Sequence, residues 1–170
     1  MENLLLLLAT TMLLRRPATD NRFQRYYIHD TGCSVHFPSD FYTLDKSTTA
    51  DGDTLYFKEC SDGDVLYGMI AIQQADTTKD ADGLLYEFML SLHDAFSIEH
   101  KTGLKFEKVY PENNYVRCYS DYWQDADGVD WKAKGWTDGH TIAVLYVKNI
   151  NSLPVDRQDF FLDSFRFPNS

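Results

Sequence analysis

The sequence carries too little positive charge for a typical nucleic-acid-binding protein. Its 16 lysines and arginines stand against 26 aspartates and glutamates, which gives a formal net charge of −10 at pH 7. Nonspecific affinity for nucleic acid depends on neutralising phosphates with basic side chains, so this balance disfavours nucleic acid as a partner. The same charge aids solubility and permits a basic protein partner.

Cysteine is also scarce, and its spacing disfavours two kinds of site. The three cysteines, Cys33, Cys60 and Cys118, are far apart, and no C-x-x-C pair occurs. A tetrahedral zinc site usually draws on local pairs of Cys or His. An odd number of cysteines is a poor disulfide framework for a chain of this size. We interpret all three as buried free thiols.

The motifs of common catalytic and nucleotide-binding sites are missing. The chain has no G-x-S-x-G elbow, no P-loop, no G-x-G-x-x-G loop and no H-E-x-x-H helix. We therefore assign no cofactor and no catalytic residue. A small hydrolase or lyase that uses histidine and carboxylates stays the alternative. It requires His93, His100 or His140 within hydrogen-bond reach of a carboxylate in a concave pocket.

Aspartate–glycine steps, in contrast, are abundant. Five of the nine glycines follow an aspartate, and Asp-Ala-Asp-Gly occurs at 80–83 and again at 125–128. Asp-x-Asp-Gly is the centre of a calcium loop, but neither copy has the glutamate that such a loop needs at position 12. Turn and helix-cap chemistry explains both copies without a metal, so we assign no metal site. A weak, irregular calcium site at Asp125, Asp127 and Asp130 is the alternative.

Short β-rich segments dominate the chain after its first 20 residues. Eight of them are predicted strands: Tyr26–His29, Ser34–Phe37, Thr54–Glu59, Val65–Gln73, Leu104–Tyr110, Tyr115–Trp123, Val129–Trp136 and Thr141–Lys148. Two segments have helical spacing: Leu84–Phe96, with Asp82 placed to cap it, and Pro154–Phe165. Residues 21–170 are thus predicted to form a single α+β domain. Its largely antiparallel sheet is flanked by helices, in the order four strands, helix, four strands, helix.

The Asp-Gly steps predict the register of three hairpins. A two-residue type I′ turn at 62–63 places Tyr56 opposite Met69. A turn at 127–128 followed by one at 138–139 predicts a three-strand meander from about residue 115 to residue 148. In that register, Asp125 faces Asp130, a like-charge pair that counts against it.

The turn at 127–128 also produces the main candidate site. It sets three pairs on one face of the sheet: Trp123 with Lys132, Asp121 with Lys134, and Tyr119 with Trp136. Tyr, Trp and Arg are the residue types that dominate protein interfaces. The candidate partner-binding face consists of Tyr115, Arg117, Tyr119, Trp123, Lys132, Lys134 and Trp136. The alternative is that this face is covered core.

The segment at 1–20 has an apolar run, Leu4–Leu14, that is as long as a signal-peptide core and too short to span a bilayer. Glu2 stands where a signal peptide has basic residues. We favour a packed helix that covers the second face of the sheet or forms a homodimer, with a cytoplasmic location. Strand Thr141–Val147 needs such cover because it is apolar on both faces. An exported cell-envelope protein is the alternative.

Two short stretches resemble the PsbP-like superfamily, which also holds a Ran-binding nuclear-import factor. Cys33–Phe41 (CSVHFPSDF) is similar to the start of such domains, and Asp159–Phe167 (DFFLDSFRF) is similar to their closing helix. The resemblance covers about Tyr26 to Phe167. It implies an antiparallel sheet flanked by helices, with no family-wide catalytic set. On this basis we expect a non-enzymatic protein-binding or accessory module.

Overall fold

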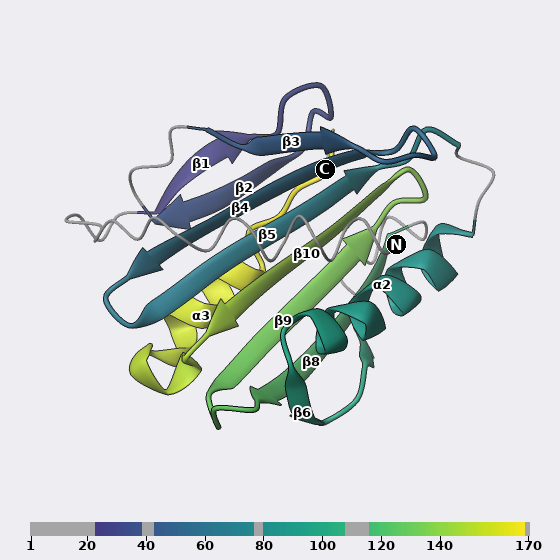
Figure 1. The fold of residues 1–170 in the computed structure, drawn as a ribbon. Helices are drawn as coiled ribbons and strands as arrows, with labels where there is room; N and C mark the ends of the chain where they lie inside the picture. Colours follow the sequence, from purple (N-terminus) through teal and green to yellow (C-terminus); the bar gives the residue numbers. More distant parts are fainter. Residues whose placement is uncertain (1–22, 39–42, 77–79, 108–115, 169–170) are drawn as a thin grey trace.

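The computed structural model describes residues 23–38, 43–76, 80–107 and 116–168 (Figure 1). The expectations for residues 1–20 (packed helix, homodimer, signal) lie outside these residues. The elements are β1 (Phe23–Tyr27), β2 (Ser34–Pro38), β3 (Asp45–Thr48), β4 (Thr54–Asp62), β5 (Val65–Gln73), α2 (Ala81–Ala95), β6 (Ile98–Lys101), β7 (Lys105–Glu107), β8 (Arg117–Asp125), β9 (Asp130–Thr137), β10 (Thr141–Lys148), the short 3₁₀ helix η1 (Ile150–Ser152) and α3 (Val155–Leu162).

The main sheet is antiparallel throughout. Its strands run in the order β3-β4-β5-β10-β9-β8-β6, and β7 also pairs with β8. Strands β1 and β2 form a separate antiparallel hairpin. The predicted α+β class with a largely antiparallel sheet is therefore confirmed.

The predicted order of four strands, helix, four strands, helix is wrong, because the described chain has five strands on each side of α2. The two strands that the sequence analysis missed are β3 and β6, which lie at opposite ends of the strand order. Their sequences, DKST and IEHK, are short and largely polar. Edge strands are commonly built this way, so they lack the alternating apolar pattern that reveals an inner strand.

The two faces of the sheet support separate cores. On one face, the even-numbered residues of β10 pack with Leu85, Met89 and Leu92 of α2. On the other face, its odd-numbered residues pack with Phe161 and Leu162 of α3 and with the β1–β2 hairpin. Figure 1 shows α2 in front of the sheet and α3 behind it. The second face is thus covered by α3 and β1–β2, where the leucine-rich N-terminal segment was predicted.

Helix α2 begins one turn earlier than predicted. Its N-cap is Asp80, whose side chain accepts a hydrogen bond from the backbone N–H of Gly83 at 3.2 Å. Asp82, the predicted cap, lies in the first turn and accepts a hydrogen bond from the Tyr119 hydroxyl at 3.1 Å. The first Asp-Ala-Asp-Gly therefore starts a helix, as expected, but through its other aspartate.

Two hairpins are displaced by two residues from the predicted register. In β4–β5, Tyr56 lies opposite Ala71, and Asp62 pairs with Val65. The turn residues are therefore Gly63 and Asp64, of which only the glycine has a positive φ. A type I′ turn needs positive φ at both positions, whereas type II′ needs it only at the first. The β9–β10 hairpin turns in the same way at 139–140. A shift of two residues keeps every side chain on its predicted face.

The β8–β9 hairpin is displaced by one residue, which changes the face of every side chain on one strand relative to the other. Trp123 lies opposite Trp131, and Tyr119 lies opposite Gly135. The reason is a three-residue loop, 126–128, with φ of +76° at its glycine. Asp125 stabilises this three-residue loop, because its Oδ1 accepts hydrogen bonds from the backbone N–H groups of residues 127 and 129. The unfavourable Asp125–Asp130 pair is thereby avoided.

A glycine in β5 makes room for the largest buried side chain of β10. Gly68 lies directly opposite Tyr146, and a Cβ added to Gly68 would be 2.0 Å from Tyr146 Cζ. The ring lies across this glycine, and its hydroxyl donates a hydrogen bond of 2.6 Å to Glu59 Oε1 on β4. Three neighbouring strands are therefore joined by one fully buried tyrosine.

Gly68→Ala should lower the free energy of unfolding by about 2 to 3 kcal/mol, because the new methyl group overlaps the Tyr146 ring. Denaturant unfolding measures this loss. The control is the same change in a Tyr146→Leu background, where we expect a much smaller loss because the ring is gone. Equal losses in the two backgrounds would contradict the explanation.

Candidate functional site

The predicted partner-binding face is divided between the two sides of the sheet. Arg117, Tyr119 and Trp123 belong to the face that α2 covers. The other three described members, on β9, belong to the α3 face; these are Lys132, Lys134 and Trp136. Tyr115 lies outside the described residues. The division follows directly from the one-residue displacement of the β8–β9 register.

The two tryptophans of the predicted face are core residues. Each is 2% exposed. Trp123 contacts the His93 ring edge-on at 5.1 Å, and Trp136 stacks on Phe165 with ring centroids 5.8 Å apart. Neither indole can contact a partner. Both side chains are covered by the core of the protein itself.

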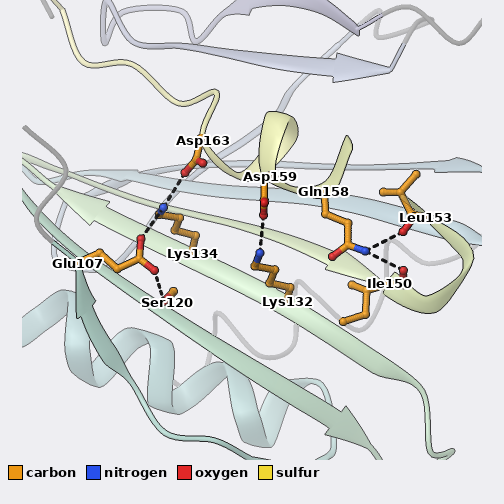
Figure 2. A network of polar contacts seen from close by, with 9 residues as sticks. All are labelled: Glu107, Ser120, Lys132, Lys134, Ile150, Leu153, Gln158, Asp159 and Asp163. Atoms are coloured by element: carbon orange, nitrogen blue, oxygen red, sulfur yellow. Dashed lines mark hydrogen bonds and ion pairs between the residues drawn. The ribbon is translucent and has the colours of Figure 1, made fainter. Parts of the chain in front are cut away.

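The two lysines hold α3 and its C-terminal end on the sheet (Figure 2). Lys132 Nζ lies 2.5 Å from Asp159 Oδ1 on α3. Lys134 Nζ lies 2.6 Å from both Glu107 Oε2 and Asp163 Oδ1. Burial alone would raise the pKa of Glu107, but hydrogen bonds from Lys134 and Ser120 outweigh it and lower that pKa. The basic half of the predicted face is therefore structural.

A neutral contact completes the attachment of α3. The side-chain amide of Gln158 donates hydrogen bonds to the backbone carbonyls of Ile150 and Leu153, at 2.9 and 2.8 Å (Figure 2). It satisfies two carbonyls of the connection between β10 and α3.

One histidine lies close to a carboxylate, as the hydrolase alternative requires, but not in a pocket. His93 Nε2 lies 3.4 Å from Asp121 Oδ2, and Lys101 Nζ lies 3.0 Å from His93 Nδ1. The His93 and Asp121 side chains are only 5% and 0% exposed, so a substrate cannot reach them. His100 and His140 are exposed, and neither adjoins the pocket described below. The pair acts as a buried polar contact.

The cysteines have low reactivity, although Cys60 is only partly buried and not fully buried as predicted. All three are free, and burial raises the pKa of Cys33 to about 11 and those of Cys60 and Cys118 to about 12. Thiols with such pKa values are protonated at neutral pH and are poor nucleophiles and metal ligands. No group of three or more Cys, His, Asp or Glu suited to a metal ion occurs among the described residues.

An exposed aromatic cluster is the feature that the sequence analysis only partly found. The Tyr119 ring contacts Tyr86 of α2 at 6.0 Å and Phe106 of β7 at 5.8 Å. Tyr86 is 44% exposed and Phe106 is 53% exposed. We call Tyr86, Phe106 and Tyr119 the aromatic edge patch. Tyr86 lies outside the apolar stripe of α2. This position is the sequence signal from which its exposure could have been predicted.

The position of α2 explains why the patch is uncovered. Phe106, Tyr119 and Gly135 lie side by side across β7, β8 and β9. The helix sits on the glycine, where an added Cβ would approach Met89 Sδ to 2.8 Å. A helix about 10 Å wide covers about two strands spaced about 4.8 Å apart. Strand β7 and the outer side of β8 are therefore left open to solvent.

A pocket lies elsewhere, between the β1–β2 hairpin and the β3–β4 edge. Its volume is about 330 Å³. Seven residues line it: Tyr26, Tyr27, His29, Thr43, Leu44, Lys46 and Tyr56. Sequence reasoning did not find it because strand β3, which supplies Lys46, was not predicted.

Replacing Lys134 with methionine leaves Glu107 and Asp163 without their cation. The free energy of unfolding at pH 7 should fall by about 1 to 3 kcal/mol, less than for a fully buried pair because both carboxylates are partly exposed. The lowered pKa of Glu107 means that its contribution is present above pH 4.5 and is lost as the pH falls through its folded-state pKa. The difference from wild type should therefore shrink by pH 3.5. A constant difference would contradict the ion pair, and exposed Arg25→Met is the control.

The stability of the protein should also decrease as the pH falls below neutrality, because His93 takes up a proton. Burial and then the charge of Lys101 lower its pKa, while Asp121 and Asp94 act in the opposite direction. The unfolded chain takes up this proton near pH 6.5, so stability is complete above that pH and is lost as the pH falls below it. His93→Gln should reduce the slope of unfolding free energy against pH between 7 and 5.5. A slope equal to that of wild type in His93→Gln would refute the assignment.

Comparisons with known proteins give a distant likeness to a solved structure. No family model matches the chain, and no curated protein matches it. The solution structure of cyanobacterial PsbP from Synechocystis superposes with a TM-score of 0.49 at 13% sequence identity, covering 91% of this chain and 98% of that one. Among the described residues, no helix is both long and apolar enough to cross a membrane.

Proposed function

We propose that the protein is a non-enzymatic binding module whose protein partner docks on the aromatic edge patch. The observation that carries the proposal is the contiguity of three rings, two of them about half exposed, at the edge that α2 does not cover. Aromatic residues supply much of the binding energy at protein interfaces. A cluster of them exposed at one place marks an interaction site, whereas isolated exposed residues do not.

The surroundings of the patch suit a polypeptide partner. Leu90 lies one turn after Tyr86 on α2 and is 36% exposed, so it extends the apolar surface. Arg117 and Asp82 flank the rings as a partly exposed pair, with Nε and Oδ2 3.9 Å apart. A polar rim around an apolar centre is the usual arrangement of such interfaces. The net charge of −10 favours a partner that is basic and offers an apolar anchor side chain.

The chemistry of the histidines supports a binding module over the hydrolase alternative. The His93–Asp121 pair is sealed from solvent. A catalytic base must reach the proton that it abstracts, so this pair does not serve that role as it stands.

Affinity capture from the cells that make the protein tests the proposal. Tyr86→Ala and Phe106→Ala should each weaken the captured complex by at least about tenfold, about 1.4 kcal/mol, while circular dichroism and thermal unfolding stay close to wild type. Tyr122→Ala is the matched control, because Tyr122 is 46% exposed on the opposite face.

Two results would overturn the proposal. One is that the patch variants and Tyr122→Ala retain the same partner at the same strength. The other is that sedimentation shows a wild-type dimer that Phe106→Ala converts to a monomer, because the patch would then be covered by a second copy of the chain.

A further inference from the structure

The pocket between the β1–β2 hairpin and the β3–β4 edge is rich in hydrogen-bond donors. Tyr56 is 1% exposed, and its hydroxyl is buried without a hydrogen-bond partner. Lys46, opposite Tyr56 in the sheet, brings its ammonium to 5.5 Å from the Tyr56 ring centre. Leaving a buried hydroxyl unpaired costs free energy, so this hydroxyl calls for an explanation.

The loop after β1 fixes the position of Lys46. Asp30 Oδ2 lies 3.0 Å from Lys46 Nζ, and the two side chains are 70% and 50% exposed. Asp30 has a φ of +67°, a conformation that aspartate tolerates better than most residues. An ammonium has three N–H donors, and this contact uses one of them. Lys46 therefore keeps donors for a second acceptor.

The lining has donors but no carboxylate of its own. None of its seven residues is acidic. Three are tyrosines, whose rings can contact the apolar or aromatic part of a ligand. A tyrosine-lined pocket can also bind a cation, but here the Lys46 ammonium already lies near the Tyr56 ring. A second cation would meet repulsion from that lysine, whereas an anion would meet attraction, which the paired Asp30 carboxylate reduces.

We propose that this pocket binds a small ligand with an aromatic or apolar body and one carboxylate group. The carboxylate accepts hydrogen bonds from Lys46 and from the Tyr56 hydroxyl, and the body lies against Tyr26 and Tyr27. The volume of about 330 Å³ is near the lower end of ligand pockets, which fits a ligand of roughly one ring and a short chain. The proposal is independent of partner binding at the aromatic edge patch.

Three probes of similar size test the charge requirement: 3-phenylpropanoate, 3-phenylpropanamide and 3-phenylpropylamine. Titration of the ¹⁵N-labelled full chain should shift the amide signals of residues 26–29 and 46 with the carboxylate, at a dissociation constant on the order of 1 mM. The amide should bind at least about tenfold more weakly and the amine more weakly still. Signals of Tyr86 and Phe106 should not move.

Variants separate binding from folding. Lys46→Met should weaken binding of the carboxylate probe at least about tenfold, while Lys105→Met at the other end of the sheet should not change it. Tyr56→Phe should weaken binding of the probe. The midpoint of thermal unfolding should stay the same or rise, because the change removes an unpaired buried hydroxyl. A peptide ending in free phenylalanine, compared with its C-terminal amide, tells whether the natural carboxylate belongs to a small molecule or a chain end. Equal or tighter binding of the amine, or no shift with any probe at 10 mM, would overturn the proposal.

Discussion

Strand β10 is buried on both of its faces, and the rest of the structure depends on this constraint. Residues 141–147 are all buried, and they include the fully buried Tyr146. A strand of this kind needs cover on two sides, which α2 provides on one and α3 with the β1–β2 hairpin on the other. Three neighbouring strands are then joined where Tyr146 crosses Gly68 to reach Glu59.

The cover of each face has a limited width, and both proposed sites lie where it is incomplete. On one face, α2 sits over Gly135 and leaves Phe106 and Tyr119 beyond its edge. On the other face, the β1–β2 hairpin meets the β3–β4 edge with a space that is lined by tyrosines and Lys46. Between these two places, the Lys132 and Lys134 ion pairs hold α3 down, so the basic side chains of β9 are used for stability.

The sequence predicted best where burial alone determines the structure. Strands Val65–Gln73 and Thr141–Lys148 were predicted with the observed boundaries, because they are apolar on both faces. The polar edge strands β3 and β6 carry no such pattern and were missed. The presence of a turn at each Asp-Gly was predicted correctly for the three hairpins. Its type was not, since that depends on which residues adopt positive φ and on how Asp125 bonds to the loop.

The candidate site was harder to predict than the fold, because it depends on register. Displacement by one residue placed Trp136 in the core against Phe165 and left Tyr119 on the other face, beside two aromatic rings from distant parts of the sequence. No local pattern connects Tyr86, Phe106 and Tyr119. The sequence analysis named Tyr119 and Arg117, but as members of a face that the observed register divides between the two sides of the sheet.

The most direct test of partner binding at the aromatic edge patch is photo-crosslinking in the cells that make the protein. A benzophenone amino acid is placed at residue 106, or at residue 122 on the opposite face as the control. We predict a discrete crosslinked protein from position 106 and none from position 122. Equal products from both positions, or a product only from position 122, would contradict the account.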